Sequence, residues 1–439
     1  MEVSYKALLM DSANALTKTK IRFRILTLVF INVVINYMDR TNLSIAATSL
    51  SRDLELSSVQ LGLLFSAFGW TYAIMQIPGG FLVDRIAPRL LYAVSLISWS
   101  ITTLFQGLVN QFSILFSLRL AVGVLEAPSY PMNNKIVTSW FPNHERAFAI
   151  AVYTSGQYIG LAFLTPVMIS IEHYWGWRTL FLITGIVGIL WGVIWYLRYR
   201  DSNEHKKVNK AELDHIAGGD LSSNQPVLAA QQKGKIDWVN LLYAFSHVKL
   251  WGIYIGQFAI GANMWFFLTW FPTYLVKYRG LDFLQSGYLS SIPFVAAFVG
   301  ILLSGFFSDF MVRKGVSLAI ARKAPVITGL ILSISIVGAN YVDSPFWIIL
   351  FMTTSFFGTG LASITWIFVS TLAPKHLIGI TGGVFNFIGN LSAISTPLVI
   401  GLLVKDGDFS SALIFIALIG CVGLFAYIFM VGRLHRIEH

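Results

Sequence analysis

The first long apolar stretch of the chain, residues 25–49, reads ILTLVFINVVINYMDRTNLSIAATS. A helix of about 20 such residues crosses the hydrocarbon core of a bilayer. Of the 439 residues in the chain, 56% are apolar and only 12% are charged, about half the charged share of a soluble globular protein. The apolar runs are continuous, whereas the strands of a membrane barrel would alternate. The sequence therefore predicts an all-α polytopic membrane protein.

Runs of the same kind recur to the end of the chain, separated by Gly, Pro and charged residues. They predict twelve transmembrane helices, near residues 25–49, 59–85, 89–110, 112–135, 146–170, 177–198, 248–276, 284–311, 323–342, 345–372, 377–404 and 410–433. If the N-terminus is cytoplasmic, the inside segments hold 24 of the 31 Lys and Arg residues and the outside segments hold 5. This asymmetry favours a cytoplasmic location for both termini.

The longest polar stretch, from about Arg200 to Trp238, divides the predicted spans into two sets of six. A short repeat supports this division, because GFLVD at 80–84 follows the second span and GFFSD at 305–309 follows the eighth. The expected organisation is an N-terminal tail (1–24), an N-terminal six-helix bundle (25–198), a cytoplasmic linker (199–247), a C-terminal six-helix bundle (248–433) and a C-terminal tail (434–439).

Four charged residues lie deep within predicted spans, whereas most others gather at the span ends. Asp39 and Arg40 are in the first span, and Arg119 and Glu126 are in the fourth. The latter two are seven residues apart, close to two helical turns, so they share one helix face. Each charge at the centre of a membrane helix costs about 2.5–3.5 kcal/mol. We therefore expect all four side chains to face the interior of the N-terminal bundle.

Two interpretations of these four residues are open. In the first, they form a structural ion-pair network with zero net charge that holds the bundle together. In the second, the two carboxylates exchange protons and the guanidinium groups bind an anion. The second is favoured by an asymmetry between the halves, since the C-terminal spans contain no deep charge. They offer only polar and aromatic residues, such as Gln257, Trp265, Ser363, Thr365, Trp366 and Asn386.

Three uncharged residues in the N-terminal spans are candidates for the same interior surface. Tyr37 lies three residues before Arg40 and shares its helix face. Tyr72 and Gln157 fall in the middle of the second and fifth spans. Lining a cavity and packing between helices are equally compatible with each of them.

Signatures of soluble enzymes are missing from the sequence. It contains no P-loop, no dinucleotide-binding glycine motif and no zinc-spaced set of Cys and His. All eight His residues fall in or beside polar segments, so no histidine metal site is expected. We expect no enzymatic activity, no cofactor and no metal. The net charge of +10 follows from the inside loops and does not indicate nucleic-acid binding.

Several motifs carry a resemblance to a known family. They are YMDRTNLS at 37–44, QIPGG at 76–80 and RLAVGVLEAPSYP at 119–131. Together they resemble the anion:cation symporters, a branch of the major facilitator superfamily, over nearly the whole chain. Further blocks are similar to bacterial sugar-acid transporters: WFPNHER at 140–146, YTSGQ at 153–157, WFFLTWFP at 265–272 and SITW at 363–366. One departure is Ala87-Pro88, which replaces the usual glycine and basic residue of the superfamily's loop signature.

The resemblance implies a monomeric transporter of the bacterial inner membrane that imports a sugar-acid anion, D-galactonate or a closely related hexonate, together with protons. Asp39 and Glu126 would couple the protons, Arg40 would bind the substrate carboxylate, and Arg119 would pair with the acids. The other implied substrate-binding residues are Tyr37, Tyr72, Gln157, Ser363, Thr365, Trp366 and Asn386.

Other functions remain open at this point. Glucarate, galactarate or another organic anion could be the substrate, and a proton-independent facilitator would use the same fold. An exporter of amphipathic drugs is disfavoured by the deep arginines, which suit anions. A membrane sensor without transport is disfavoured because the sequence contains no signalling domain.

Overall fold

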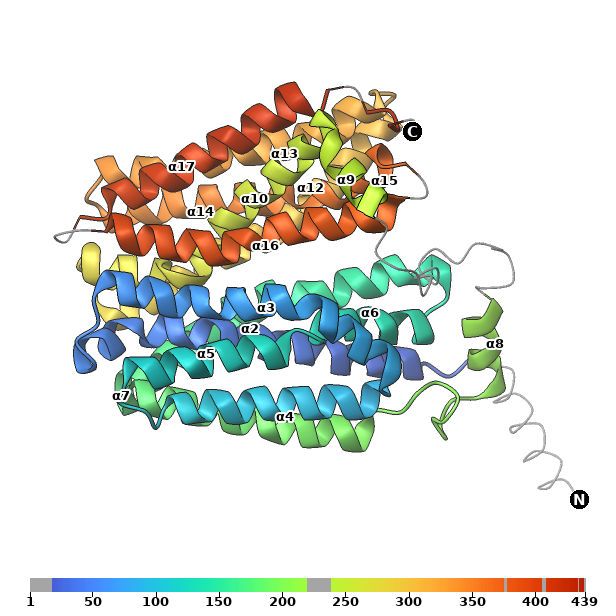
Figure 1. The fold of residues 1–439 in the computed structure, drawn as a ribbon, viewed down its shortest axis with the longest axis horizontal. Coiled ribbons are helices and arrows are strands. Elements are labelled where there is room, and N and C mark those ends of the chain that lie inside the picture. Colours follow the sequence, from blue (N-terminus) through green and yellow to red (C-terminus); the bar gives the residue numbers. More distant parts are fainter. Residues whose placement is uncertain (1–17, 219–237, 375–376, 405–407, 433, 438–439) are drawn as a thin grey trace, which may run out of the picture.

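The computed structural model describes residues 18–218, 238–374, 377–404, 408–432 and 434–437. Helices dominate these residues, and no β-strand occurs among them apart from an isolated bridge residue at Asp408. Figure 1 shows two layers of long, roughly parallel helices, with α2 to α7 in one layer and α10 to α17 in the other. The expected all-α class is confirmed.

The N-terminal bundle contains six helical elements. They are α2 (Ile21–Asp53), α3 (Ser58–Arg85), α4 (Pro88–Gln106), α5 (Phe112–Glu126), α6 (Ser129–Trp140) and α7 (Asn143–Arg198). A capping box starts α3, because Ser57 Oγ accepts from the Gln60 amide and the Gln60 side chain accepts from the Ser57 amide. Ala127 and Pro128 separate α5 from α6, so Glu126 is the last residue of α5.

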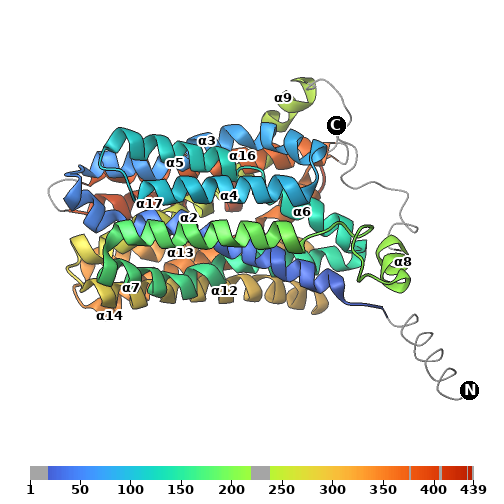
Figure 2. The same ribbon diagram turned by 90° about the horizontal axis from the view of Figure 1, so that it is seen from below.

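The long helix α7 contains two helical segments that meet at Gly176. This residue has φ +80° and ψ 163°, a conformation that essentially only glycine adopts. At the start of α7, Glu145 contacts His215 of the linker, whereas Arg178, just past Gly176, pairs with Asp53 at the end of α2. Near its end, Tyr196 accepts a hydrogen bond from Arg89 at the start of α4. The chain therefore crosses the bundle twice within α7. The segment before Gly176 packs on α2, where Gly156 meets Phe30, and the segment after it packs on α4, where Gly185 meets Leu104 (Figure 2).

The C-terminal bundle repeats this arrangement with more local irregularity. Its helical elements are α10 (Val248–Thr269), α11 (Phe271–Thr273), the π-helical turn η1 (Tyr274–Tyr278), α12 (Phe283–Arg313), α13 (Leu318–Ile334), the 3-10 turn η2 (Ser335–Tyr341), α14 (Pro345–Leu361), the 3-10 turn η3 (Ala362–Thr365), α15 (Trp366–Leu372), α16 (Ile378–Leu403), α17 (Ser410–Phe425) and the π-helical turn η5 (Ala426–Met430). Asp282 and Ser317 cap the starts of α12 and α13 through their side-chain oxygens.

The two bundles are in close contact at the end of the molecule remote from the linker helices α8 (Lys210–Gly218) and α9 (Trp238–Ser246), here called the distal end. There, Ser44 Oγ donates to the Thr269 carbonyl over 2.6 Å. Helix α3 also packs on α16, with Gly62 against Pro397 and Gly401. Toward the linker end of α3, nothing lies within 4 Å of the position that a Cβ of Gly80 would occupy. The bundles are therefore closed together at the distal end.

The linker contributes a docked element at the opposite end. Glu212 of α8 is fully buried, and its carboxylate accepts from the backbone amides of Ile21 and Arg22 and from the Arg22 guanidinium. Arg22 also pairs with Glu145 at 2.9 Å. These contacts fix the start of α2 to both α7 and α8 (Figure 2).

Nine helices of the described residues are long and apolar enough to cross a membrane. The segment His144–Arg198 counts once among them, although it contains the break at Gly176. Multiple membrane crossings are therefore supported, and the predicted total of twelve stays a prediction. The predicted domain limits stay predictions too, and those at residues 1, 433 and 439 lie outside the described residues.

Candidate functional site

Asp39 and Arg40 lie in the middle of α2, which packs on α7 and touches α10 and α11 of the other bundle. The Asp39 side chain is fully buried, and Arg40 is 8% exposed. Both charged side chains therefore face the protein interior, as the sequence predicted. Both groups are buried, so their neighbours must compensate for the lost solvation.

The compensation for Arg40 is an ion pair with Glu126, at the end of α5. Arg40 Nε donates to Glu126 Oε1 over 2.6 Å, and Arg40 Nη2 is 2.5 Å from the same oxygen. The Glu126 side chain is fully buried. Hydrogen bonds between two charged groups are about twice as strong as those between neutral groups, although here both nitrogens approach one oxygen and Glu126 Oε2 has no hydrogen-bond partner among the described residues.

Three aromatic rings enclose the Arg40 guanidinium. Its central carbon lies 4.9 Å from the ring centre of Tyr37, 4.9 Å from that of Phe68 and 5.0 Å from that of Tyr72. Rings at these distances attract a cation through their negative faces. Tyr37 and Tyr72, both predicted for the site, are thus in place beside Arg40. Phe68 is an addition that the sequence did not single out.

Asp39 has a different partner from Arg40. Its Oδ2 accepts from the indole Nε1 of Trp99 in α4 over 2.9 Å, and both side chains are fully buried. Trp99 was not predicted, because an indole in an apolar helix usually serves packing alone. Within the described residues, Asp39 Oδ1 has no hydrogen-bond partner.

Arg119 is buried in α5 and lies near the same groups. Its guanidinium carbon is 5.9 Å from the ring of Phe68, which Arg40 also contacts. It interacts electrostatically with both Glu126 and Asp39. Among the described residues, Arg119 Nε and Nη1 and Glu126 Oε2 have no hydrogen-bond partner. The four deep charges therefore form one cluster that leaves polar atoms available for a ligand or a proton.

Gln157 of α7 lies at the edge of this cluster. Its Oε1 accepts a long hydrogen bond, 3.4 Å, from the hydroxyl of Tyr130 in α6. The Tyr130 ring also makes an edge contact with Tyr153. Tyr130 belongs to the quoted motif at 119–131 but was not predicted as a site residue. Its position two residues after the break between α5 and α6 brings it to Gln157.

The predicted residues of the C-terminal bundle form a separate group. Thr365 Oγ1 donates to Gln257 Oε1 over 2.8 Å, joining η3 to α10. Trp366 is 51% exposed, and its ring meets Phe385 edge-on at 5.0 Å between ring centres. Asn386 is exposed and accepts from Asn390 through its backbone carbonyl, while Ser363 is partly buried.

The structure brings together the N-terminal candidates but does not join them to the C-terminal ones. Within the described part of the chain, no hydrogen bond or ion pair links Arg40 or Glu126 to Ser363, Thr365, Trp366 or Asn386. Aromatic contacts between the bundles join Phe68 to Trp265, at 6.1 Å between ring centres, and Phe65 to Trp270, at 5.3 Å. An anion held by Arg40 and contacted by both bundles would have to bridge the two groups.

A histidine cluster that the sequence did not predict lies at the linker end. Ligand atoms of His144, Glu145 and His215 lie within 4.8 Å of one another. The expectation of no histidine metal site missed this proximity, because 70 residues separate His215 from Glu145. Glu145 already accepts from Arg22 at 2.9 Å and from His215 at 3.0 Å. The contacts of Glu145 with Arg22 and His215 therefore explain why these side chains lie together.

Comparison with known proteins identifies the family. Residues 29–397 match the family model described as Major Facilitator Superfamily. The chain belongs to this superfamily. It is 46% identical over 428 residues to a D-galactonate transporter of Escherichia coli O6:H1, covering 97% of this chain and 99% of the relative. It is also 40% identical to a probable galactarate/D-glucarate transporter of Bacillus subtilis, covering 96% and 94%.

Solved structures of superfamily transporters share the fold. A bacterial homologue of the human lysosomal transporter Spinster, inward-facing and occupied, matches with a TM-score of 0.76 at 18% identity, covering 95% of this chain and 98% of that one. A D-xylose-proton symporter matches with a TM-score of 0.71 at 16% identity, covering 94% and 98%. The predicted superfamily is confirmed, and the chain is a multi-pass membrane transporter, not an enzyme.

Proposed function

We propose that this transporter imports a sugar-acid anion, D-galactonate or a closely related hexonate, in symport with protons and by alternating access. The observation that carries the proposal is the buried pair of Arg40 and Glu126, at 2.5 and 2.6 Å, enclosed by Tyr37, Phe68 and Tyr72. The sugar-acid substrate is supported by relatives whose names state D-galactonate and galactarate/D-glucarate.

The pair suggests how proton and anion binding are coupled. While Glu126 is ionised, it occupies the donors of Arg40. A proton on Glu126 removes the negative charge that competes for Arg40, so a substrate carboxylate can take its place and accept from the same guanidinium. Protonation of Asp39 makes the cluster more positive again and further favours an anion. Loss of the Glu126 proton on the inner side restores the pair with Arg40 and expels the substrate, and loss of the Asp39 proton makes the cluster less positive and so weakens anion binding.

The remaining substrate contacts follow from the positions of the uncharged candidates. Tyr37, Tyr72 and Gln157 offer hydroxyl and amide groups from the N-terminal bundle. Ser363, Thr365, Trp366 and Asn386 would meet the hydroxylated carbon chain from the C-terminal bundle. Arg119 is assigned to balance the two carboxylates, because it interacts electrostatically with both.

The proposal includes a membrane topology. We assign twelve spans by counting α7 as two and adding α4 and α10 to the other candidate helices. Both termini and the linker 199–247 are placed in the cytoplasm, as the distribution of Lys and Arg favours. The tails are 1–24 and 434–439, the bundles are 25–198 and 248–433, and the transporter acts as a monomer in a bacterial inner membrane.

Purified protein in liposomes that contain a pH-sensitive dye provides the test. D-galactonate, D-gluconate and D-glucarate are added in turn to the wild type, Asp39→Asn, Glu126→Gln and the control Glu172→Gln. Glu172 is also buried, but its partner is Ser49, near the distal end of α2. We expect substrate-dependent acidification for the wild type and the control, and its loss in both site variants.

Each other result has a defined meaning. Labelled substrate could enter without acidification, and equally well in both site variants. The carboxylates would then form structural ion pairs only, and the protein would be a proton-independent facilitator. A response to D-glucarate alone would move the substrate assignment to aldarates. If two protons accompany one monoanion, an inside-negative membrane potential should accelerate uptake, and insensitivity to potential would contradict that stoichiometry.

A further inference from the structure

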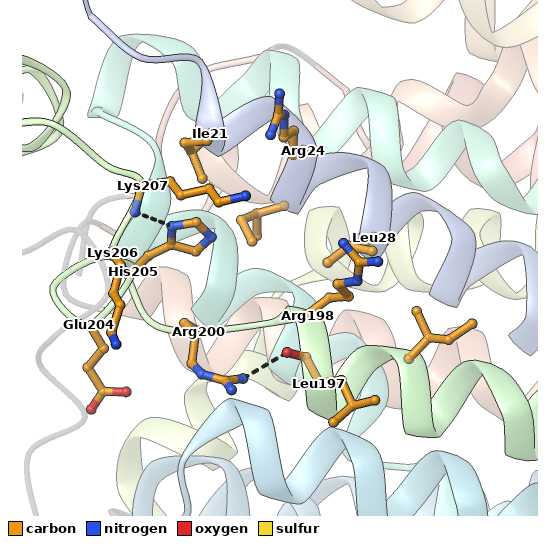
Figure 3. A pocket seen from close by; sticks show the side chains of 12 residues that line it. Ile21, Arg24, Leu28, Leu197, Arg198, Arg200, Glu204, His205, Lys206 and Lys207 are labelled. Atoms are coloured by element: carbon orange, nitrogen blue, oxygen red, sulfur yellow. Dashed lines mark hydrogen bonds between the residues drawn. The ribbon is translucent and has the colours of Figure 1, made fainter.

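A groove of about 660 Å³ lies between the start of α2 and the end of α7, away from the site described above. Figure 3 shows the loop after α7 curving past it, so that side chains of this loop and of both helices surround one space. Its rim carries five basic side chains, Arg24, Arg198, Arg200, Lys206 and Lys207. We call this feature the basic groove.

The cations of the basic groove are poorly neutralised by the protein itself. Glu204 is the acid that lines the groove, and it forms no ion pair with a residue of the described chain. Arg200 uses its Nη1 to donate to the carbonyls at the end of α7, including Leu197 at 3.2 Å. Arg24, Arg198, Lys206 and Lys207 take part in no ion pair within the described segments. The groove therefore presents a net positive surface.

His205 lies on the loop side of the groove, where the surplus of positive charge affects its pKa. Partial burial lowers the pKa of His205, and the charges of Lys207 and Arg200 add to the lowering, against opposing contributions from a backbone hydrogen bond and from Glu212. Its ring nitrogen Nδ1 accepts from the Lys207 amide at 3.3 Å. A neutral imidazole that is held among cations is suited to contact an anion without adding a charge of its own.

The opposite wall of the groove is apolar. Ile25 and Leu28 of α2 and Ile194 and Leu197 of α7 line it. Ile194 and Leu197 are 41% and 61% exposed, and in the proposed topology they belong to the membrane-facing end of a span. An occupant that matches both walls has an anionic head and an apolar body.

The C-terminal bundle has a groove at a similar position, but its basic side chains have different contacts. A groove of about 710 Å³ lies between the start of α10 and the residues after η5, and it also contains basic side chains. There, however, Lys249 Nζ contacts His435 at 3.0 Å and Arg436 donates to the Ser370 carbonyl at 3.1 Å. Its cations are engaged with the protein, whereas most of those in the basic groove are not.

We propose that the basic groove binds the headgroup of an anionic phospholipid from the cytoplasmic leaflet. Its phosphate oxygens accept from Arg24 and Arg198, with Lys206 and Lys207 contributing charge, while the acyl chains lie along Ile194 and Leu197. Basic pockets between membrane helices on the cytoplasmic side suit such headgroups. The inference rests on the proposed topology but not on the proposed substrate or on proton coupling.

Native mass spectrometry of the full-length, delipidated protein tests the proposal. Dioleoylphosphatidylglycerol and dioleoylphosphatidylcholine are titrated separately into the wild type, Arg24→Gln/Arg198→Gln and the control Arg313→Gln/Lys314→Gln. The control pair is exposed at the end of α12 and removes the same charge from the same face. Since each surface cation contributes about 1 kcal/mol, the groove variant should bind phosphatidylglycerol about 30-fold more weakly.

The outcomes separate the possible sources of the anion. Preferential retention of phosphatidylglycerol by the wild type and the control, with loss in the groove variant, supports the lipid site. Equal binding of both lipids, or equal weakening in both variants, overturns it. If millimolar inorganic phosphate displaces the lipid from the wild type, the groove recognises a soluble phosphate instead. Circular dichroism of both variants verifies that they are folded, and failure of symport would leave this result unaffected.

Discussion

Arg40 Nε donates to Glu126 Oε1 over 2.6 Å, joining the middle of α2 to the last residue of α5 across 86 residues of sequence. The family resemblance assigns Arg40 to the substrate carboxylate and Glu126 to the proton. Because the two side chains are each other's partners, these assignments describe a competition for one contact. Under the proposed mechanism, the interpretations as a structural pair and as a functional pair would apply to different states of the same transporter.

Replacing Arg40 by Lys tests the geometry of this contact without changing its charge. An ammonium cannot present two donors in the fork that a carboxylate accepts, and it stacks less well between aromatic rings. We expect Arg40→Lys to fold but to lose at least tenfold in apparent substrate affinity, measured by uptake of labelled D-galactonate. Arg178→Lys is the matched control, because Arg178 pairs with Asp53 in an exposed position. Equal uptake by both variants would remove Arg40 from the substrate site.

Trp99 is expected to act on Asp39 as a positioning residue. Hydrogen bonds to charged groups contribute about 1.5–3 kcal/mol, so Trp99→Phe should lower stability by about that amount when Asp39 is ionised. In an Asp39→Asn background the same substitution should cost less, and a double-mutant cycle of thermal stabilities isolates the coupling. Additive effects of the two substitutions would show that the indole contributes packing alone.

Much of the fold could be predicted from hydrophobic length, because a bilayer requires runs of about 20 apolar residues. The predicted break near residues 170–177 corresponds to Gly176 within α7, where glycine alone accepts the backbone angles. The short turns η1, η2, η3 and η5 were not predicted, since they continue the predicted apolar spans and a change of helix type leaves no distinct sequence pattern. Docking of α8 on α2 through Glu212 also depends on tertiary contacts that no local pattern contains.

The charged residues of the candidate site could be predicted from the sequence, because a charge within a membrane is costly. That argument finds Asp39, Arg40, Arg119 and Glu126, since each departs from its apolar surroundings. It cannot find Trp99 or Phe68, because tryptophan and phenylalanine are common in membrane helices and their sequence context is ordinary. It also cannot tell that Arg40 pairs with Glu126 while Asp39 pairs with Trp99, because helix rotation and packing decide which group is nearest.

Gly176→Ala tests the turn between the two segments of α7. A Cβ at this position would meet nothing within 4 Å, so the cost comes from the backbone angle alone. Residues forced into this region cost about 1–3 kcal/mol, and the thermal stability of the detergent-solubilised protein should fall accordingly. Gly383→Ala, which also has open space but lies in the helix α16, should be neutral or slightly stabilising. Equal melting temperatures for the two variants would contradict this explanation.

The last prediction concerns the closed distal end. A Cβ on Gly62 would lie 2.7 Å from the Pro397 carbonyl oxygen of the other bundle, whereas one on Gly80 would meet nothing within 4 Å. Gly62→Val should therefore separate the bundles at the distal end, and Gly80→Val should not. The reporter is a cysteine introduced at Ser44 in a protein whose Cys421 is replaced by Ser. Ser44 is buried beside Thr269, so the labelling rate of this cysteine measures how easily a reagent reaches the space between the bundles. We expect an impermeant maleimide added from the distal side to label Ser44→Cys at least tenfold faster in the Gly62→Val background. Equal labelling in both backgrounds would mean that the contact of α3 with α16 does not hold this end closed.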